Sequence, residues 1–152
     1  MSPTAAGTKP QGCTNFKLRQ LTRRVSQHYD AELARTGLKT TQYSLLSVVL
    51  RLGPVQPREL ARNMRMDAST LSRNMKPLVE AGLLEVLPGR DERSRSVAIT
   101  EAGRARREEA QRHWRAAQDK INRVLGVDRV LALHALIDEA LALLSPEETD
   151  DE

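Results

Sequence analysis

Apolar residues recur every three or four positions along most of the chain, which is the spacing of one face of an α-helix. The first run ends before Gly37, and glycine often terminates a helix. The members of this run are Leu18, Leu21, Val25, Tyr29 and Leu33. A second run over residues 43–50 predicts another helix, which stops at Gly53. Thr40 or Thr41 can cap the N-terminus of this second helix.

Two short helices and a hairpin are predicted between residues 57 and 100. Pro57 suits the first turn of one helix, and Asp67 suits the N-cap of the next. Two short apolar segments, 84–87 and 96–99, then flank a polar tip that contains proline and glycine. This pattern predicts a β-hairpin.

The last two predicted helices are long and strongly apolar on one side. A helix that opens at Thr100 and runs to Leu125 spans about 37 Å, which is more than a small core requires. After Gly126, a final helix carries a wide apolar stripe. The stripe comprises Val130, Leu131, Leu133, Leu136, Ile137, Leu141, Leu143 and Leu144. Such a stripe needs a partner, and the plainest partner is a second copy of the chain.

Charge is distributed unevenly along the 152 residues. Residues 1–53 carry eight basic and two acidic side chains, residues 54–100 carry eight and six, and residues 101–152 carry eight and twelve. The net charges of these segments are therefore +6, +2 and −4. This pattern indicates a side of the molecule that faces a polyanion and a separate acidic end. The overall charge of +4 favours nucleic acid only weakly.

The composition excludes several classes of protein. Aromatic residues make up only 3% of the chain, which disfavours a stacking platform for RNA or single strands. The single cysteine, Cys13, excludes an intramolecular disulfide and a multi-cysteine zinc site. No apolar run approaches 18 residues, and the N-terminus lacks the apolar core of a signal peptide. We therefore expect a cytoplasmic protein that makes no contact with a membrane.

The segment 57–81 has the form of a helix-turn-helix. The residues expected to pack inward are Leu60, Ala61, Met64, Leu71, Met75 and Leu78. The second helix then exposes hydrogen-bonding and basic side chains, namely Ser69, Thr70, Ser72, Arg73, Asn74 and Lys76. Such side chains contact phosphates and base edges, and arginine grips guanine through two bonds. Pro77 is expected to kink this helix beyond its DNA-reading part; alternatively, the helix ends near Lys76.

The hairpin tip carries Arg90, Arg93 and Arg95, which suit entry into a narrow, electronegative minor groove. A polar helix face beside a charged loop is often only solvated surface, but a hairpin with an arginine tip next to it favours DNA binding. A non-specific architectural DNA-binding protein would share the charge. It would need neither the hairpin nor a reading helix rich in serine and threonine, and its salt dependence would distinguish it.

The chain resembles the MarR (multiple antibiotic resistance regulator) family of bacterial winged helix-turn-helix repressors. The resemblance covers about residues 14–144 and is carried by D-A-S-T-L-S-R-N-M-K-P-L-V-E-A-G-L-L-E (67–85) and R-D-E-R-S-R-S-V-A-I-T-E-A-G (90–103). The wing pattern of the family falls on Asp91, Arg93, Val97, Ile99, Thr100 and Gly103. One departure from a general helix-turn-helix is Arg65, which stands where the turn often has glycine.

The resemblance implies an obligate homodimer, interlocked through its first, fifth and sixth helices, that reads a pseudo-palindromic operator in double-stranded DNA. It also implies that the polar face of the second motif helix enters the major groove and that Arg93 reaches the minor groove. Asp91 is expected to brace the wing through an ion pair. The function implied is sequence-specific transcriptional regulation, as a repressor that responds to a ligand.

The expected fold is mainly α, a winged helix-turn-helix with a small β-hairpin wing and long N- and C-terminal dimerisation helices. Residues 38–100 form the DNA-binding unit, and residues 13–36 with 101–144 form the dimerisation region. The remaining segments, 1–12 and 145–152, are polar and are predicted to be disordered tails, the second of them acidic.

The resemblance also implies a small anionic aromatic effector, bound between the dimerisation helices and the winged unit. The candidate residues are Arg19, Arg23, His28, Tyr43 and Trp114, since an arginine pairs with a carboxylate through two bonds. The alternative is that both arginines are solvated surface and that Trp114 belongs to the core or the dimer interface. No cofactor is expected.

Cys13 suggests an alternative function, a regulator that senses oxidants through a thiol. One branch of the family senses organic hydroperoxides through a cysteine near this position, supported by tyrosines. Here the cysteine falls about two residues too early, and Arg19 stands in the area where a tyrosine is expected. The plainer interpretation is a partly exposed thiol with no role.

Neither a metal site nor an enzyme is expected. The histidines, His28, His113 and His134, fall in different predicted helices, so no single helix supplies two of them. A zinc site would have to be assembled across helices. The chain has no glycine-rich phosphate loop, no G-x-S-x-G and no H-E-x-x-H.

Overall fold

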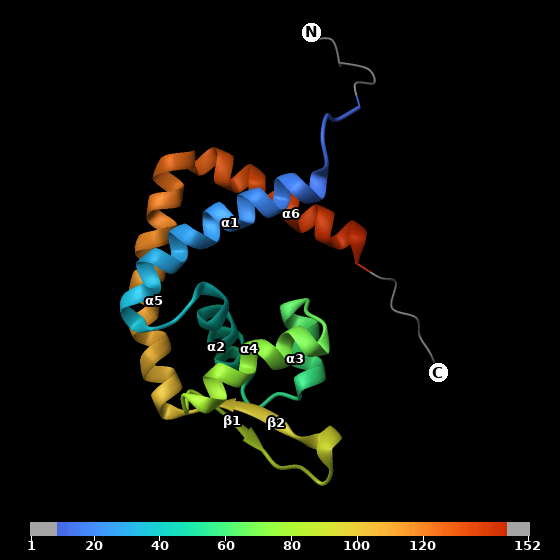
Figure 1. Ribbon diagram of the computed structural model, residues 1–152, viewed down its shortest axis with the longest axis vertical. Coiled ribbons are helices and arrows are strands. Elements are labelled where there is room, and N and C mark those ends of the chain that lie inside the picture. Colours follow the sequence, from blue (N-terminus) through green and yellow to red (C-terminus); the bar gives the residue numbers. More distant parts are fainter. Residues whose placement is uncertain (1–8, 146–152) are drawn as a thin grey trace.

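Six α-helices and one β-hairpin make up the part of the chain that the computed structural model describes, residues 9–145 (Figure 1). The elements in chain order are α1 (Thr14–Leu33), the 3₁₀ turn η1 (Ala34–Thr36), α2 (Thr40–Leu52), α3 (Pro57–Met64), α4 (Ala68–Glu80), β1 (Leu84–Leu87), the 3₁₀ turn η2 (Glu92–Ser94), β2 (Ser96–Ile99), α5 (Glu101–Leu125) and α6 (Val127–Leu144). The expected mainly helical winged fold is confirmed. The predictions of disorder for residues 1–8 and 146–152 lie outside the described residues.

The helices form two regions that share α5 (Figure 1). At the top, α1 and α6 cross, while α2, α3, α4 and the hairpin form a winged lobe below. Contacts join α5 to α1 and α6 in the upper region and to α2 in the winged lobe. The length of α5, 25 residues or about 37 Å, is therefore explained, because this helix spans both regions.

The core lies inside the winged lobe. Its largest side chains with less than 2% exposure are Leu33, Leu45, Leu46, Leu60, Leu78, Leu84, Val49 and Val97. They come from α1, α2, α3, α4 and both strands, so each element contributes its apolar face. Each such side chain contributes about 1.5–3 kcal/mol when it leaves water. The lobe is thus held rigidly enough to position side chains on its surface.

The junction between α1 and α2 departs from the predicted capping. Gly37 has φ 73° and terminates η1, as its position after the apolar run predicted. Neither Thr40 nor Thr41 is the N-cap of α2, so that expectation was wrong; Lys39 occupies the position. The Asp30 carboxylate on α1 instead accepts hydrogen bonds from the Thr40 backbone N–H at 2.7 Å and from its hydroxyl at 2.9 Å. This pair of bonds ties α1 directly to the winged lobe.

The hairpin is anchored to α5 by a tight contact at its base. β1 and β2 are antiparallel, with Leu84 opposite Ile99. The Thr100 hydroxyl accepts from the Gly103 N–H at 3.0 Å and donates to the Gly82 carbonyl at 2.7 Å. A Cβ on Gly103 would lie 2.0 Å from the Leu83 carbonyl oxygen. Glycine is therefore required at position 103 for α5 to approach the wing this closely.

The C-terminal end of α6 returns to the winged lobe. Arg65, between α3 and α4, donates from Nη1 to the Ser145 hydroxyl at 3.0 Å. This hydrogen bond places Ser145, the last residue that the structure describes, beside the helix-turn-helix. The separate acidic end expected from the charge distribution falls mostly on residues outside the described part and stays a prediction. Within residues 9–145, no helix combines the length and the apolar character needed to cross a bilayer.

Candidate nucleic-acid interface

The helix predicted to read DNA, α4, begins at a well-formed cap. Asp67 has extended backbone, and its carboxylate accepts from the Thr70 N–H at 2.7 Å and from the Ser69 hydroxyl at 2.8 Å. Capping of this kind satisfies a backbone donor that the helix itself leaves free. These hydrogen bonds, that from Thr70 N–H foremost, lower the pKa of Asp67 from its ordinary 3.8 to about 2. The carboxylate is thus ionised at neutral pH and fixes the start of α4.

The turn before α4 depends on an unusual backbone conformation at Arg65. Its φ of 52° lies in the left-handed region, which side chains other than glycine rarely adopt. Hydrogen bonds hold the turn: the Arg65 N–H donates to the Arg62 carbonyl at 3.2 Å and the Met66 N–H to the Ala61 carbonyl at 2.9 Å. These bonds stabilise the conformation, so the absence of the usual glycine leaves the motif intact.

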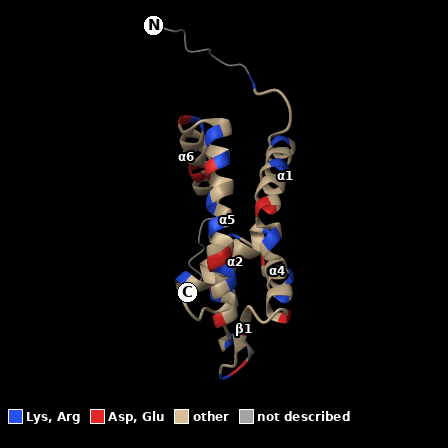
Figure 2. Cartoon of the chain, turned by 90° about the vertical axis from the view of Figure 1, so that its left-hand side faces the viewer, with Lys and Arg blue, Asp and Glu red and all other residues tan. Residues whose placement is uncertain are grey.

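The polar face of α4 is oriented partly by its own contacts. Ser69, Ser72, Arg73 and Lys76 are exposed, while Thr70 and Asn74 are half-buried. Arg73 donates to the Thr70 hydroxyl at 3.4 Å, the Asn74 amide contacts the Met66 sulfur at 3.6 Å, and Lys76 lies 4.0 Å from Glu80. Figure 2 shows basic positions along α4 and in the loop of the wing. The four exposed side chains are therefore accessible on α4, Thr70 and Asn74 are only partly so, and the DNA contacts of all six stay a prediction.

Pro77 lies inside α4, which continues to Glu80. The helix therefore does not end near Lys76. Proline has no backbone N–H, so the Arg73 carbonyl receives no hydrogen bond from it. The residues assigned to DNA reading all precede this point.

The wing is braced by a local hydrogen-bonded turn. The Asp91 carboxylate accepts from the Ser94 N–H at 2.9 Å, and the Ser94 hydroxyl accepts from the Asp91 N–H at 3.0 Å. Asp91 thus stabilises the turn through the backbone; the ion pair expected for it stays a prediction. Arg90, Arg93 and Arg95 are all exposed around this turn. The tip therefore presents three guanidinium groups on a braced support.

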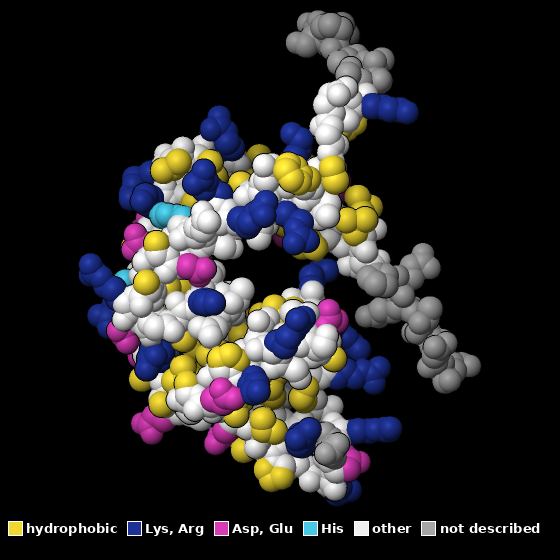
Figure 3. Space-filling view, viewed as in Figure 1, with side chains coloured by type: hydrophobic (Ala, Val, Ile, Leu, Met, Phe, Trp, Pro, Cys, Tyr) yellow, Lys and Arg dark blue, Asp and Glu magenta, His cyan; other side chains and the backbone are white. Residues whose placement is uncertain are grey.

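A second basic surface was missed by the sequence analysis. Arg58, Arg62 and Arg65 are exposed and follow a spacing of four and three along α3 and its C-terminal cap. We call these three residues the α3 arginine stripe. Figure 3 shows Lys and Arg side chains at the edge of the winged lobe where α3 lies. The spacing of Arg58 and Arg62, four residues apart on a predicted helix, was the signal that would have found two of the three; Arg65 lies in the turn that follows.

The five predicted effector residues do not come together in one cavity. Arg19 and Arg23 are exposed on α1, and Arg19 precedes His28 by nine residues, or about 13 Å of helix. The His28 ring donates from Nε2 to the Ala117 carbonyl of α5 at 3.1 Å. Tyr43 stacks on Trp114, with ring centroids 6.0 Å apart. Their common role in effector binding therefore stays a prediction, and the structure divides them among separate places.

The Tyr43–Trp114 pair belongs to a contact between α2 and α5 that includes a cation. The Arg107 guanidinium carbon lies 5.7 Å from the Tyr43 ring centroid, and its Nε donates to the Ser47 hydroxyl at 3.0 Å. The neighbouring Arg106 donates to the Thr36 carbonyl at 3.0 Å. These contacts join the long helix to the winged lobe and help set the angle between them.

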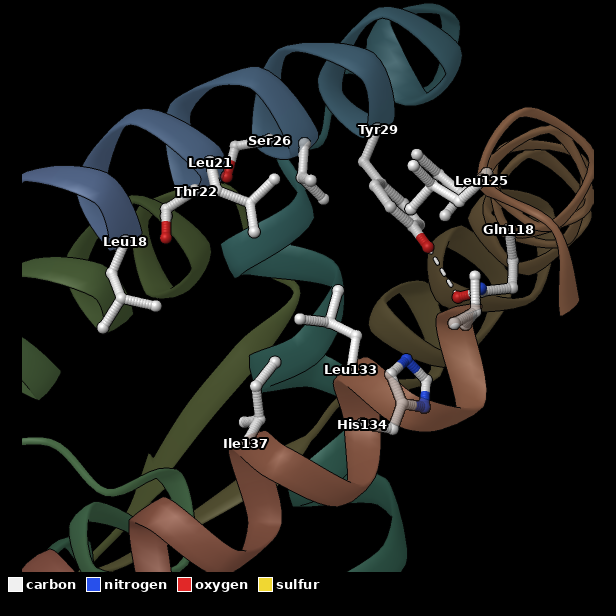
Figure 4. Close-up of a pocket in the computed structure, with 13 residues that line it drawn as sticks. Leu18, Leu21, Thr22, Ser26, Tyr29, Gln118, Leu125, Leu133, His134 and Ile137 are labelled. Carbon is white, nitrogen blue, oxygen red and sulfur yellow. Dashed lines mark hydrogen bonds between the residues drawn. The ribbon is translucent and has the colours of Figure 1, made fainter. Parts of the chain in front are cut away.

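A cavity of about 260 Å³ lies between α1, α5 and α6, and none of the five predicted effector residues lines it. Leu18 and Leu21 of α1 face Leu133 and Ile137 of α6 across this space (Figure 4). On one side the Tyr29 hydroxyl donates to Gln118 at 2.5 Å (Figure 4). Burial raises the pKa of this tyrosine, so the hydroxyl stays protonated and remains a donor. The cavity is mainly apolar, with a polar wall.

The remaining candidates keep their status as predictions. Cys13 is exposed at the N-cap of α1, and its side chain makes no capping hydrogen bond there. In the described part of the chain, residues 9–145, no three histidine, cysteine or acidic side chains gather as metal ligands would.

An N-capped helix with an exposed polar face, a braced arginine-rich wing and a helix-turn-helix core define a winged helix DNA-binding protein. Residues 36–94 match the sequence profile of the MarR family. The DNA-bound crystal structure of the M. tuberculosis transcriptional regulator MosR aligns at 32% identity and a TM-score of 0.70, covering 85% of this chain and 98% of that chain. The chain belongs to the MarR family of DNA-binding transcriptional regulators.

Two further relatives agree with this assignment. A probable transcriptional regulator from Pseudomonas aeruginosa is 26% identical, with a TM-score of 0.75, over 84% of this chain and 96% of that chain. The HTH-type transcriptional regulator YwoH of Bacillus subtilis, itself uncharacterised, is 27% identical over 93 residues, which are 61% of this chain and 68% of that protein. All of these relatives are regulators of transcription.

Proposed function

We propose that the chain is a ligand-responsive repressor that binds a pseudo-palindromic operator as a homodimer. The observation that carries this proposal is the exposed polar face of α4, capped by Asp67 and flanked by the arginine-tipped wing. Ser69, Ser72 and Arg73 occupy the N-terminal half of α4, which is the part that a recognition helix directs at base edges. Phosphate contacts from the wing and from α3 would set the register.

The apolar surface of the dimerisation helices supports self-association. Large apolar side chains remain exposed on α1, α5 and α6: Phe16, Leu18, Leu21, Val124, Val127, Leu131, Leu136, Ile137, Leu141, Leu143 and Leu144. Leu143 and Leu144 are 79% and 83% exposed, in contrast to the leucines of the winged lobe. Covering this surface with the same surface of a second copy would remove it from water, and this is the usual symmetry of small regulators.

The dimer would fix the distance between two copies of α4. Two half-sites one helical turn apart require the recognition helices to lie on the order of 34 Å apart. An effector that alters the packing of α5 against α2 would change this distance. It must bind the two arrangements with different affinity, since otherwise it shifts nothing. Such a change would act where Tyr43 contacts Arg107 and stacks on Trp114, and both aromatic residues are predicted effector residues.

Selection of binding sites from a random duplex pool, at near-physiological salt, tests the proposal. We expect an inverted repeat with half-sites about 10 base pairs apart. Light scattering should give twice the chain mass of 17.0 kDa. Binding that is steeply salt-dependent without a recovered sequence would support the architectural alternative. A monomer in solution, or no duplex binding by reduced, refolded protein, would contradict the proposal.

A further inference from the structure

The end of α6 meets the helix-turn-helix at a defined contact. Arg65 Nη1 donates to the Ser145 hydroxyl at 3.0 Å, and that hydroxyl donates to the Leu141 carbonyl at 2.7 Å. Figure 1 shows this end of α6 on the side of the molecule where α3 lies. Ser145, the last residue that the structure describes, therefore lies beside a surface to which we assign DNA contacts.

The surface at this point is the α3 arginine stripe. Arg58, Arg62 and Arg65 are all exposed. Within residues 9–145, none of the three guanidinium groups has a carboxylate partner within the 4.0 Å that defines an ion pair. Three exposed guanidinium groups on α3 and its C-terminal cap, without carboxylate partners in the described part of the fold, fit a segment that carries several carboxylates.

We propose that residues 146–152 bind the α3 arginine stripe and compete there with the phosphates of DNA. This segment reads Pro-Glu-Glu-Thr-Asp-Asp-Glu, with five carboxylates and no lysine or arginine. Seven residues reach at most about 24 Å. The helix α3 has eight residues and is about 12 Å long, so the segment can reach all of the stripe from Ser145.

The competition would act mainly on non-specific binding, and this inference rests on the proposed DNA binding. Each carboxylate–arginine pair at the surface is weak and screened by salt. The segment is tethered, however, so its effective concentration at the stripe is in the millimolar range. Non-specific DNA binding is almost wholly electrostatic, whereas operator binding also has base contacts. The segment therefore raises the ratio of specific to non-specific affinity.

Two triple variants with equal changes in net charge test the competition. The first carries Glu147→Gln, Glu148→Gln and Asp150→Asn. The control carries Glu108→Gln, Glu109→Gln and Asp119→Asn, which alter exposed residues of α5. At about 50 mM salt, we expect the first variant to bind random duplex about threefold to tenfold more tightly than the control, with the difference closing near 300 mM.

The selected operator should gain less affinity than the random duplex in the first variant. If the affinity for random duplex rose equally in the two triple variants, net charge alone would explain the increase, and the proposal would be overturned. A first variant that binds random duplex no more tightly than the parent would overturn it as well.

A second measurement needs no DNA. The side-chain Nε–H signals of the α3 arginine stripe, observed by NMR in the full chain, should differ between the parent and the first variant. They should be the same in the parent and the control. Unchanged signals in both variants would overturn the proposed contact. If the parent bound no duplex, DNA binding itself would be refuted, while these signals would still decide whether residues 146–152 occupy the stripe.

Discussion

Gly103→Ala sets two well-understood effects against each other at the base of the wing. In the interior of an exposed helix, replacing glycine by alanine stabilises the helix by up to about 1 kcal/mol. Gly103, however, is buried in the first turn of α5, where that helix meets β2 and the residue before β1. A Cβ there would lie 2.0 Å from the Leu83 carbonyl oxygen and 2.8 Å from Ile99 Cγ1. The steric effect and the helix propensity therefore have opposite signs.

The steric effect should dominate. A carbon and an oxygen atom approach each other ordinarily to about 3.3 Å, so α5 and the Leu83 carbonyl must separate by about 1.3 Å. That carbonyl accepts the Thr100 N–H at 3.1 Å, a bond worth about 0.5–1.5 kcal/mol that the shift would weaken. Overpacking of a dense interior costs about 1–3 kcal/mol. After the gain in propensity is subtracted, we expect a net destabilisation of about 1–3 kcal/mol.

Thermal unfolding at one fixed protein concentration measures this effect, because the stability of an oligomer depends on concentration. The expected fall in Tm is about 3–10 °C for a chain of this size. Ala105→Gly, at an exposed position of the same helix, is the matched control for propensity and should cost about 1 kcal/mol. An unchanged or higher Tm for Gly103→Ala would refute the reasoning, because it would show that the close contact does not constrain the wing.

The other predictions concern charge and DNA. For Asp67→Asn, the loss in free energy of unfolding should be constant above about pH 4 and shrink as the pH falls towards 2. The reason is that the pKa of Asp67 is lowered in the folded state, so this carboxylate stabilises the fold only while it is ionised. Urea titrations at several pH values measure this loss, and a loss that does not change with pH would contradict the prediction. Arg73→Ala should cost about 1–3 kcal/mol of operator binding and relax the sequence recovered by site selection, whereas an unchanged site would exclude base reading by this residue. Arg93→Ala should weaken binding, lower the salt slope by about 1 and reduce the preference for flanks with a narrow minor groove. The control for both arginine variants is Arg123→Ala, which removes an exposed arginine of α5 outside the candidate nucleic-acid interface.

The sequence predicted the elements well because their signals are local. Apolar spacing, an aspartate cap at Asp67 and glycine stops at Gly37 and Gly126 all act within a few residues, and the structure confirms each element they predicted. The cap of α2 was mispredicted for the opposite reason. Its first turn is bonded by Asp30, ten residues earlier on another helix, and no local pattern contains that contact.

The same contrast between local patterns and long-range contacts separates the candidate residues that could be predicted from those that could not. Residues of the α4 face and the wing could be proposed because they lie on one short segment with a recognisable pattern. The effector residues came from three different helices, and the sequence holds no information on whether such helices bring them together. Arg107 was missed for this reason: its contacts with Tyr43 and Ser47 join positions 64 and 60 residues apart.

The stacked pair of Tyr43 and Trp114 gives the protein an intrinsic fluorescence signal from the contact between α2 and α5. Trp114 is the only tryptophan in the chain, so all indole fluorescence arises at the contact between α2 and α5. A ligand that alters this contact would change the wavelength or intensity of that emission without any label. A ligand bound elsewhere, with no effect on the contact, would leave the emission unchanged. Screening compounds by intrinsic fluorescence would therefore select for those that move the winged lobe.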